Sequence, residues 1–110
     1  MTRLHSTKAT AIKIEALPGQ EEDLATLLNQ ASVLVSDNEP ATHVWYALRL
    51  SKNTFMIFDT FSDESGRAAH FAGKAASALK EHSERLIVGG WEKGVVANIE
   101  NYDIISGFSR

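Results

Sequence analysis

The sequence predicts a single α+β domain in which two helices cover one face of an antiparallel sheet. Three observations predict this fold class. Two segments carry apolar residues at helical spacing, four segments have the period or composition of strands, and their order is strand, helix, strand, strand, helix, strand. The chain has 110 residues, close to the commonest size of one domain, so we expect one domain over residues 1–110.

The first strand is predicted over residues 8–16. Alternate residues place Thr10, Ile12, Ile14 and Ala16 on one side and Ala9, Ala11, Lys13 and Glu15 on the other. A period of two is typical of a half-buried strand, although the contrast between the two sides is weak before Ile12. Pro18 and Gly19 follow directly and end the strand.

A helix is predicted over residues 20–38, because apolar residues recur there at helical spacing and form one stripe. The stripe consists of Leu24, Leu27, Leu28, Ala31, Leu34 and Val35. The acidic residues Glu21, Glu22 and Asp23 occupy the first turn, where the helix dipole favours anions. Pro40 ends the helix, since the residue before a proline is disfavoured in the helical conformation.

A hairpin is predicted from two strands, residues 42–50 and 54–61, joined by a turn at 51–53. On the first of these strands, one face carries Val44, Tyr46, Leu48 and Leu50, and the other carries His43, Trp45, Ala47 and Arg49. On the second, one face carries Phe55, Ile57, Asp59 and Phe61, and the other carries Met56, Phe58 and Thr60. Both faces hold bulky residues, so both are expected to be at least partly covered, with Tyr46 in the core.

A second helix is predicted to begin after Ser62, which is interpreted as its N-cap, and to extend toward residue 85. Its apolar stripe is expected to consist of Ala68, Phe71, Ala72, Ala75 and Leu79. Residues 88–94 form a predicted glycine-punctuated loop that carries Trp91, and residues 95–105 form the last predicted strand. The core spans about 8–106, and residues 1–7 and 107–110 are expected to be flexible tails.

The predicted order, βαββαβ, is the ferredoxin-like arrangement. The second face of its sheet carries apolar bulk that the two helices cannot cover. Monomeric proteins rarely leave such patches exposed. We therefore expect a homodimer in which two copies pack sheet against sheet, since two-fold pairs are the commonest oligomers.

Composition excludes several classes of function. The net charge is −3 and the basic residues are scattered, which argues against binding to nucleic acid. The sequence has no apolar run long enough to span a membrane, and its first residues lack the apolar core of a signal peptide. It contains no cysteine, so disulfides and thiolate metal sites are excluded. We expect a cytoplasmic protein.

The run "FMIFDTFSDESGRAAHF" at residues 55–71 resembles the signature of the antibiotic biosynthesis monooxygenase family. There an aromatic strand bearing an acid ends in an aromatic-x-acid turn, and a helix follows with Ala-His near its start. The matching residues are Asp59, Phe61, Asp63, Ala69 and His70. "ENYDIIS" at residues 100–106 is similar to the last strand of the family. The resemblance implies a dimeric α+β barrel.

The resemblance also implies a class of activity. Members include cofactor-free oxygenases of phenols and quinols, haem-degrading enzymes and small-molecule isomerases. The haem-degrading pattern does not fit: residues 8–16 contain no Asn, His70 stands where that pattern has Trp, and Lys80 stands where it has His. The expected function is therefore a cofactor-independent monooxygenase acting on a small phenolic or quinol-type compound, with no cofactor and no metal.

His70, Asp59 and Arg49 are the candidate catalytic residues. His70 is a candidate base, yet in an unbroken helix it lies on the wet face, and only a kink at Gly73 would bring it inside. Asp59 on its apolar face is either an anchor, bound to a backbone donor or to Arg49, or a base with a raised pKa. The anchor role is the favoured of the two.

The candidate substrate-binding residues are His43, Trp45, Phe58, Phe61 and Trp91. His43, Trp45 and Arg49 share a strand face that is able to clamp an aromatic hydroxyl compound. The same residue types are equally typical of a dimer interface. Trp91 is interpreted as a plug over a helix end, with a lid as the alternative.

Two other functions stay open. The same fold can bind a small ligand or serve in assembly without any chemistry. An isomerase of a small polar metabolite would require His43, Arg49 and Asp59 to converge in one wet cavity.

Overall fold

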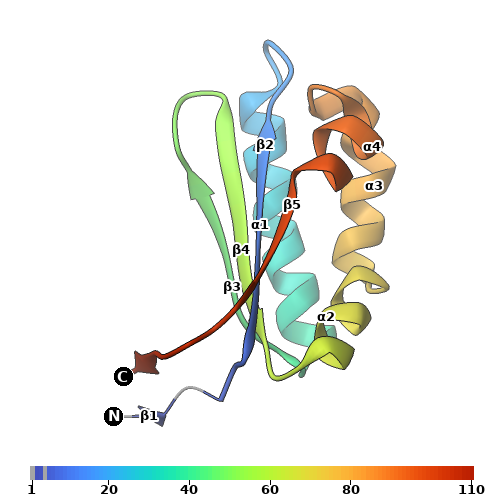
Figure 1. The fold of residues 1–110 in the computed structure, drawn as a ribbon. Coiled ribbons are helices and arrows are strands. Elements are labelled where there is room, and N and C mark those ends of the chain that lie inside the picture. Colours follow the sequence, from blue (N-terminus) through green and yellow to red (C-terminus); the bar gives the residue numbers. More distant parts are fainter. Residues whose placement is uncertain (1, 4) are drawn as a thin grey trace.

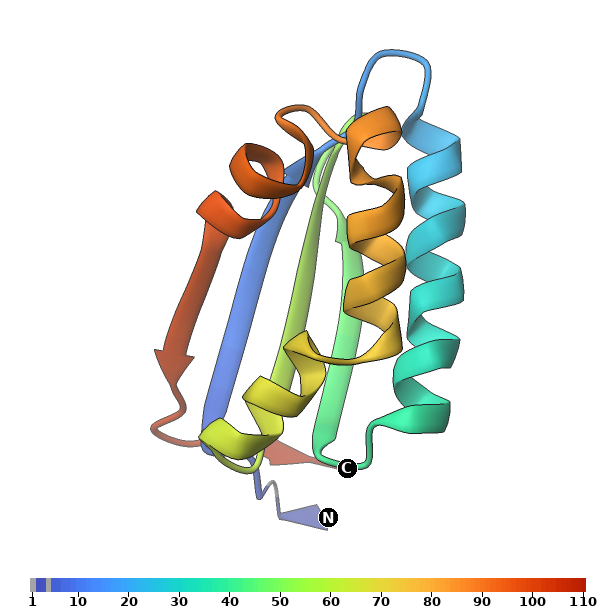
Figure 2. The ribbon, with the colours of Figure 1, turned by 90° about the vertical axis from the view of Figure 1, so that its right-hand side faces the viewer.

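The computed structural model describes residues 2–3 and 5–110, and it confirms the predicted α+β architecture. An antiparallel sheet has the strand order β3–β4–β2–β5 (Figure 1). Its strands are β2 (Lys8–Glu15), β3 (Thr42–Arg49), β4 (Thr54–Phe61) and β5 (Ile99–Asp103). The helices cover one face of this sheet (Figure 2). They are α1 (Glu21–Asn38), α2 (Glu64–Phe71), α3 (Lys74–Leu86), α4 (Gly90–Gly94) and the short 3-10 helix η1 (Val96–Asn98).

The inward face of the sheet follows from its cross-strand register. Asp59 on β4 lies opposite Thr10 on β2 and Trp45 on β3. The residues that the sequence placed together on one face of each central strand are all buried: Thr10, Ile12 and Ile14 with Ala16 just beyond β2, and Phe55, Ile57, Asp59 and Phe61 on β4. The alternation in the sequence therefore grouped these residues correctly, and the structure shows that their face is the inward one.

Helix α1 packs its predicted stripe onto this inward face. Leu24, Leu27, Leu28, Ala31 and Val35 are buried, and Leu34 is partly buried. The helix ends at Asn38, and Glu39 is its C-cap, one residue before Pro40. This end of α1 brings the Glu39 side chain to the end of α2, next to His70 and Gly73.

The second predicted helix is two helices. Helix α2 ends at Phe71, Gly73 lies between the two helices, and α3 begins at Lys74. The N-cap is Asp63 rather than Ser62, because the Asp63 carboxylate accepts a hydrogen bond from the backbone N–H of Gly66 at 3.0 Å.

The break also changes which face of α2 is buried. Ala68 and Ala72, which the sequence assigned to the apolar stripe, are exposed, whereas Arg67 and His70 are buried. A Cβ atom added at Gly73 would lie 2.8 Å from Glu39 Oε2, so a side chain there would displace this carboxylate. A glycine between α2 and α3 therefore permits the close approach of Glu39.

The C-terminal part departs from the expected loop and long strand. Trp91 lies on α4, which begins where Gly89 and Gly90 both have positive φ angles. The last strand begins only at Ile99, because η1 occupies residues 96–98. Two short strands, β1 (Thr2–Arg3) and β6 (Phe108–Ser109), pair with each other at the chain ends, within the segments expected to be tails.

The outward face of the sheet is apolar and uncovered in the single chain. Tyr46 is 58% exposed and Leu48 is 45% exposed, and Phe58 on β4 lies opposite both Tyr46 and Ala11. The expectation that Tyr46 is a core residue was wrong for the isolated chain, since none of the elements that the structure describes crosses this face. The expected surplus of apolar sheet surface is confirmed.

Candidate functional site

His70 lies between two carboxylates in the interior. Its Nε2 atom is 3.0 Å from Asp59 Oδ2, and its Nδ1 atom is 2.6 Å from Glu39 Oε1. The side chains are 7% exposed for His70, 7% for Glu39 and 1% for Asp59. We call these three residues the acid–histidine cluster. The expectation that His70 faces solvent was wrong, because the helix breaks at Gly73 as the alternative required.

Three different elements build this cluster. Asp59 comes from β4, His70 from α2 and Glu39 from the end of α1. Rings pack against His70 on two sides, since the centroids of Phe61 and Phe71 each lie 5.4 Å from its centroid. The position of the imidazole is therefore fixed by packing as well as by charge.

Asp59 is not held as the sequence suggested. Its partner is His70, neither a backbone donor nor Arg49. The contact is an ion pair whose orientation leaves both Asp59 oxygens without a hydrogen bond among the described residues. Glu39 differs, because its Oε1 accepts hydrogen bonds from Thr42 Oγ1 and from His70, while its buried Oε2 has no such bond within the described part of the chain. Asp59 thus retains free acceptor capacity in the interior.

The pKa values of Asp59 and His70 are both raised in the folded protein. Burial raises the pKa of Asp59, and the contact with His70 offsets only part of this effect. Burial acts to lower the pKa of His70, but the contacts with Asp59 and Glu39 outweigh burial, so this pKa is raised from its usual 6.5. His70 is therefore protonated over a wider pH range than a free histidine.

One edge of the cluster borders a small apolar cavity of about 30 Å³, which we call the inner cavity. Its walls come from β2, β3, β4 and four helices, α1 to α4, together with Val95. His70, Trp45 and Trp91 contribute to the lining, and the remaining lining residues are aliphatic or Phe71. Trp45, which lines the cavity, is the cross-strand partner of Asp59. Ile57, which also lines the cavity, lies two residues before Asp59 on β4. Asp59 is therefore next to residues that form the cavity wall.

A larger groove of about 350 Å³ lies between α1 and β3, on the other side of Trp45. Trp45 and Leu28 line both the groove and the inner cavity, so they form the partition between them. Arg49 lines the groove, where it contacts Glu22 at 3.0 Å and lies over the Phe55 ring at 4.8 Å. Its guanidinium is partly exposed and is available to a molecule in the groove.

The remaining predicted site residues lie elsewhere. His43 lies beside a β-bulge, and its Nδ1 is 2.8 Å from Ser6 Oγ. Phe58 belongs to the outward sheet face, and Phe61 is fully buried beneath His70. Arg49 pairs with Phe55, four residues before Asp59 on β4, a separation of about 13 Å along a strand. His43, Arg49 and Asp59 therefore do not converge in one cavity, as an isomerase site would require.

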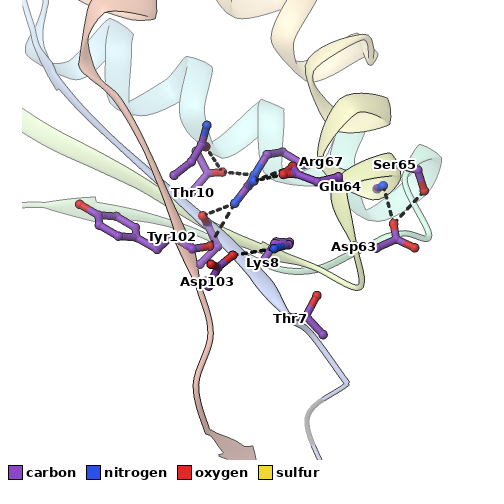
Figure 3. Close-up of polar contacts among 12 residues, drawn as sticks. Thr7, Lys8, Thr10, Asp63, Glu64, Ser65, Arg67, Tyr102 and Asp103 are labelled. Atoms are coloured by element: carbon purple, nitrogen blue, oxygen red, sulfur yellow. Dashed lines mark hydrogen bonds and ion pairs between the residues drawn. The ribbon is translucent and has the colours of Figure 1, made fainter.

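Two site residues were missed by the sequence reasoning, Glu39 and Arg67. Arg67 is buried on the same face of α2 as His70, three residues away. Figure 3 shows its guanidinium reaching β2 and β5: Nε donates to Thr10 Oγ1 at 3.0 Å, and Nη2 donates to the carbonyl oxygens of Ala9 and Tyr102. Its Nη1 also pairs with Glu64 at 2.6 Å. The spacing of Glu64, Arg67 and His70 by three was the available signal, but charged residues on a helix are usually solvated.

Within residues 2–3 and 5–110, no group of three or more acidic and histidine side chains is arranged to hold a metal ion. The two carboxylates of the acid–histidine cluster lie on opposite nitrogens of His70 and so do not converge on one point. In the described part of the chain, no helix has both the length and the apolar character needed to cross a membrane.

Comparison with known proteins places the fold. No family model and no curated protein matches the chain. Among solved structures, protein NE2512 of unknown function from Nitrosomonas europaea is 34% identical, with a TM-score of 0.85 and 96% of each chain covered. A protein from Bacteroides thetaiotaomicron described as a "putative antibiotic biosynthesis monooxygenase" is 19% identical, with a TM-score of 0.72 and 96% of each chain covered.

Another protein described in the same words, from Caulobacter crescentus, is 12% identical, with a TM-score of 0.72 and 94% of each chain covered. These alignments extend over nearly the whole chain, which confirms the fold that the residue 55–71 signature implied. The chain therefore belongs to the family of the Nitrosomonas protein, and its fold is that of the antibiotic biosynthesis monooxygenases.

Proposed function

We propose that this protein is a cofactor-independent monooxygenase acting on a small phenolic or quinol-type compound. One observation carries the proposal: the buried carboxylate of Asp59 keeps one oxygen, Oδ1, without a hydrogen bond among the described residues, and it is paired through Oδ2 with a buried histidine that lines an apolar cavity. The similar folds described as putative monooxygenases, and one described as a possible oxidoreductase, support the reaction class.

The chemistry needs little from the protein. A hydroxyarene that loses its proton becomes electron-rich enough to transfer one electron to dioxygen. The aryloxyl radical and superoxide combine, so that a C–O bond forms at a ring carbon that carries hydrogen. Loss of that hydrogen as a proton and cleavage of the O–O bond then give a quinone carbonyl and water. The substrate loses four electrons and dioxygen gains four, with one oxygen atom in each product.

The acid–histidine cluster supplies the acid–base steps. Asp59 takes the phenolic proton on a free oxygen, and burial favours this because it raises the pKa of Asp59. The same proton is returned to the departing oxygen, which leaves as water. The positive charge on His70 stabilises the anions that develop beside it, in surroundings from which water is excluded.

The substrate ring is assigned to the groove. A volume of about 350 Å³ falls within the range of small-molecule sites, whereas the inner cavity, at about 30 Å³, is too small for an aromatic ring. Trp45 offers a stacking surface, and Arg49 offers a hydrogen-bond donor for an oxygen substituent at the end of the ring remote from Asp59. Because Trp45 lies directly opposite Asp59, rotation of its side chain would open the path from the groove to this carboxylate.

We also propose a homodimer formed through the outward sheet face. Tyr46, Leu48 and Tyr102 are each 45–58% exposed there, and half-buried Met56 and Phe58 lie between them. A second copy would remove this apolar surface from water. In the single chain the site lies on the helix side of the sheet, so the dimer would stiffen the strands that carry Asp59 and Trp45.

A second candidate function is a ligand-binding module without turnover. It is favoured by the fact that both nitrogens of His70 already contact carboxylates. One experiment separates the two candidates. Purified protein, stripped of metal and flavin, is mixed with a panel of hydroquinones and polyphenols while dissolved oxygen and thermal stability are recorded. Oxygen uptake with formation of a quinone supports the monooxygenase. Thermal stabilisation without oxygen uptake supports the binding module.

A further inference from the structure

We propose that the inner cavity is a binding site for dioxygen. This inference rests on the proposed function and deepens it, because it assigns a location to the second substrate. The cavity is lined by buried or half-buried side chains from both layers of the fold, and it lies directly behind the Trp45–Leu28 wall of the groove.

The size of the inner cavity suits a diatomic molecule. Its volume of about 30 Å³ is close to the share of one molecule in liquid water, which is also roughly 30 Å³. Small alanine side chains at Ala31, Ala75 and Ala76 leave this space between α1, α3 and the sheet. Larger residues at these positions would fill the cavity.

The chemistry of the lining favours an apolar occupant over water. A buried water molecule needs roughly two to four polar partners, and apolar cavities without them stay dry. The one titratable residue in the lining is His70, and its two nitrogens face Asp59 and Glu39. The indole N–H groups of Trp45 and Trp91 are the other polar groups of the lining side chains, and both are donors only. Dioxygen requires no hydrogen-bond partner.

The position of the cavity suits the proposed reaction. The Trp45 side chain stands between the groove and this cavity, so the rotation that opens the path to Asp59 would also bring an aromatic ring in the groove next to dioxygen. The protonated imidazole of His70 borders the same space, so the charge that appears when dioxygen becomes superoxide would meet a cation. The nearby charged groups are Asp59 from β4, Glu39 at the end of α1 and Arg67 on α2. The two carboxylates, Asp59 and Glu39, favour the protonated form of His70, whereas the Arg67 guanidinium acts on Asp59, whose pKa it lowers.

The proposal is tested on the full chain with two probes that do not depend on turnover. Crystals pressurised with xenon should show a xenon atom in the inner cavity. In solution, dioxygen under pressure should broaden the methyl signals of Ala75, Ile57 and Leu79 more than those of buried methyl groups elsewhere, because dioxygen is paramagnetic. Absence of both effects in the wild-type protein would overturn the proposal.

A cavity-filling variant extends the test to catalysis. Ala75→Leu should abolish xenon binding and raise the KM for dioxygen about tenfold, with the KM for the phenol unchanged. Ala76→Leu is a second variant should Ala75→Leu fail to fold, and Ala78→Leu, on the same helix but outside the cavity lining, is the control. An unchanged KM for dioxygen in a variant that has lost xenon binding would overturn the assignment. If the wild-type protein oxidises no phenol, the proposed function fails, while the xenon and dioxygen measurements still decide whether the site exists.

Discussion

His70 Nε2 lies 3.0 Å from Asp59 Oδ2, and both side chains are almost completely removed from water. A buried pair of this kind is unusual because each charged group loses its hydration. Here a third side chain, Glu39, contacts the other nitrogen of the imidazole, and the pKa values of Asp59 and His70 are both raised. The folded protein therefore binds protons more tightly at this site than the unfolded chain does.

The first prediction concerns stability against pH. Because the pKa of His70 is raised on folding, its contribution to stability is complete below the unfolded value, near 6.5, and is lost as the pH rises through the folded value. We expect the free energy of unfolding, measured with urea, to fall as the pH rises above about 6.5. The raised pKa of Asp59 acts in the same direction from its unfolded value, 3.8, upward. In His70→Gln the slope above pH 6.5 should flatten, and an unchanged slope would contradict the assignment.

The second prediction isolates Glu39. Replacing Glu39 by Gln removes one of the two carboxylates that raise the pKa of His70, so this pKa should fall. NMR titration of the His70 ring signals measures it directly. Glu81→Gln on the exposed face of α3 should leave the titration unchanged. Identical His70 titration curves in Glu39→Gln and the wild type would show that the contact is not formed in solution.

The third prediction concerns Arg67, which joins α2 to β2 and β5 and so fixes the face of α2 that carries His70. Arg67→Leu leaves the Thr10 hydroxyl, the buried carbonyl of Ala9 and the partly buried carbonyl of Tyr102 without this donor. The free energy of unfolding should drop by about 3 kcal/mol. Arg85→Leu, on the exposed surface of α3, should change it by less than about 0.5 kcal/mol. Equal effects of the two substitutions would mean that Arg67 is an ordinary surface residue.

The strands and α1 were predictable because the apolar residues of each element recur at a regular spacing, which places them together on one buried face. Ile12 and Ile14 alternate with polar residues, and Leu24 to Val35 recur at helical spacing, so local periodicity and burial agree. Tyr46 was assigned wrongly for a related reason. Alternation shows that two faces differ, but it does not show which face another element of the same chain covers.

The acid–histidine cluster was only half predictable. The signature at residues 55–71 indicated Asp59 and His70, but the helical periodicity placed His70 outside, because it assumed one continuous helix. The break at Gly73 depends on a tertiary contact, the approach of the Glu39 carboxylate to the glycine. Glu39 itself lies 31 residues before His70, and no local pattern connects the two residues.

The fourth prediction tests the proposed homodimer. Tyr46→Glu places a charge in the centre of the outward sheet face, so the protein should sediment as a monomer at micromolar concentration while the wild type sediments as a dimer. Val33→Glu, on an exposed position of α1, should remain dimeric. A wild-type protein that is monomeric under these conditions would refute the dimer.

The fifth prediction concerns His70 in catalysis. If its positive charge stabilises the developing anion, His70→Ala should lower the rate of oxygen uptake at least about tenfold, which corresponds to about 1.4 kcal/mol in the activation barrier. His82→Ala removes a histidine that contacts Arg85 on α3 and does not line the cavity, and it should leave the rate unchanged. Circular dichroism confirms that each variant is folded. Equal rates in His70→Ala and the wild type would exclude His70 from the mechanism.

The central claim is that Asp59 accepts the phenolic proton. The most direct measurement is the pH dependence of oxygen uptake by metal-free and flavin-free protein with a hydroquinone, for the wild type and for Asp59→Asn, which keeps the size of the side chain but cannot accept the proton. We predict that the wild type consumes oxygen and forms the hydroxyquinone, and that Asp59→Asn loses most of this rate at neutral pH but recovers it as the pH approaches the pKa of the hydroquinone. Equal rates in the two proteins at neutral pH would contradict the claim.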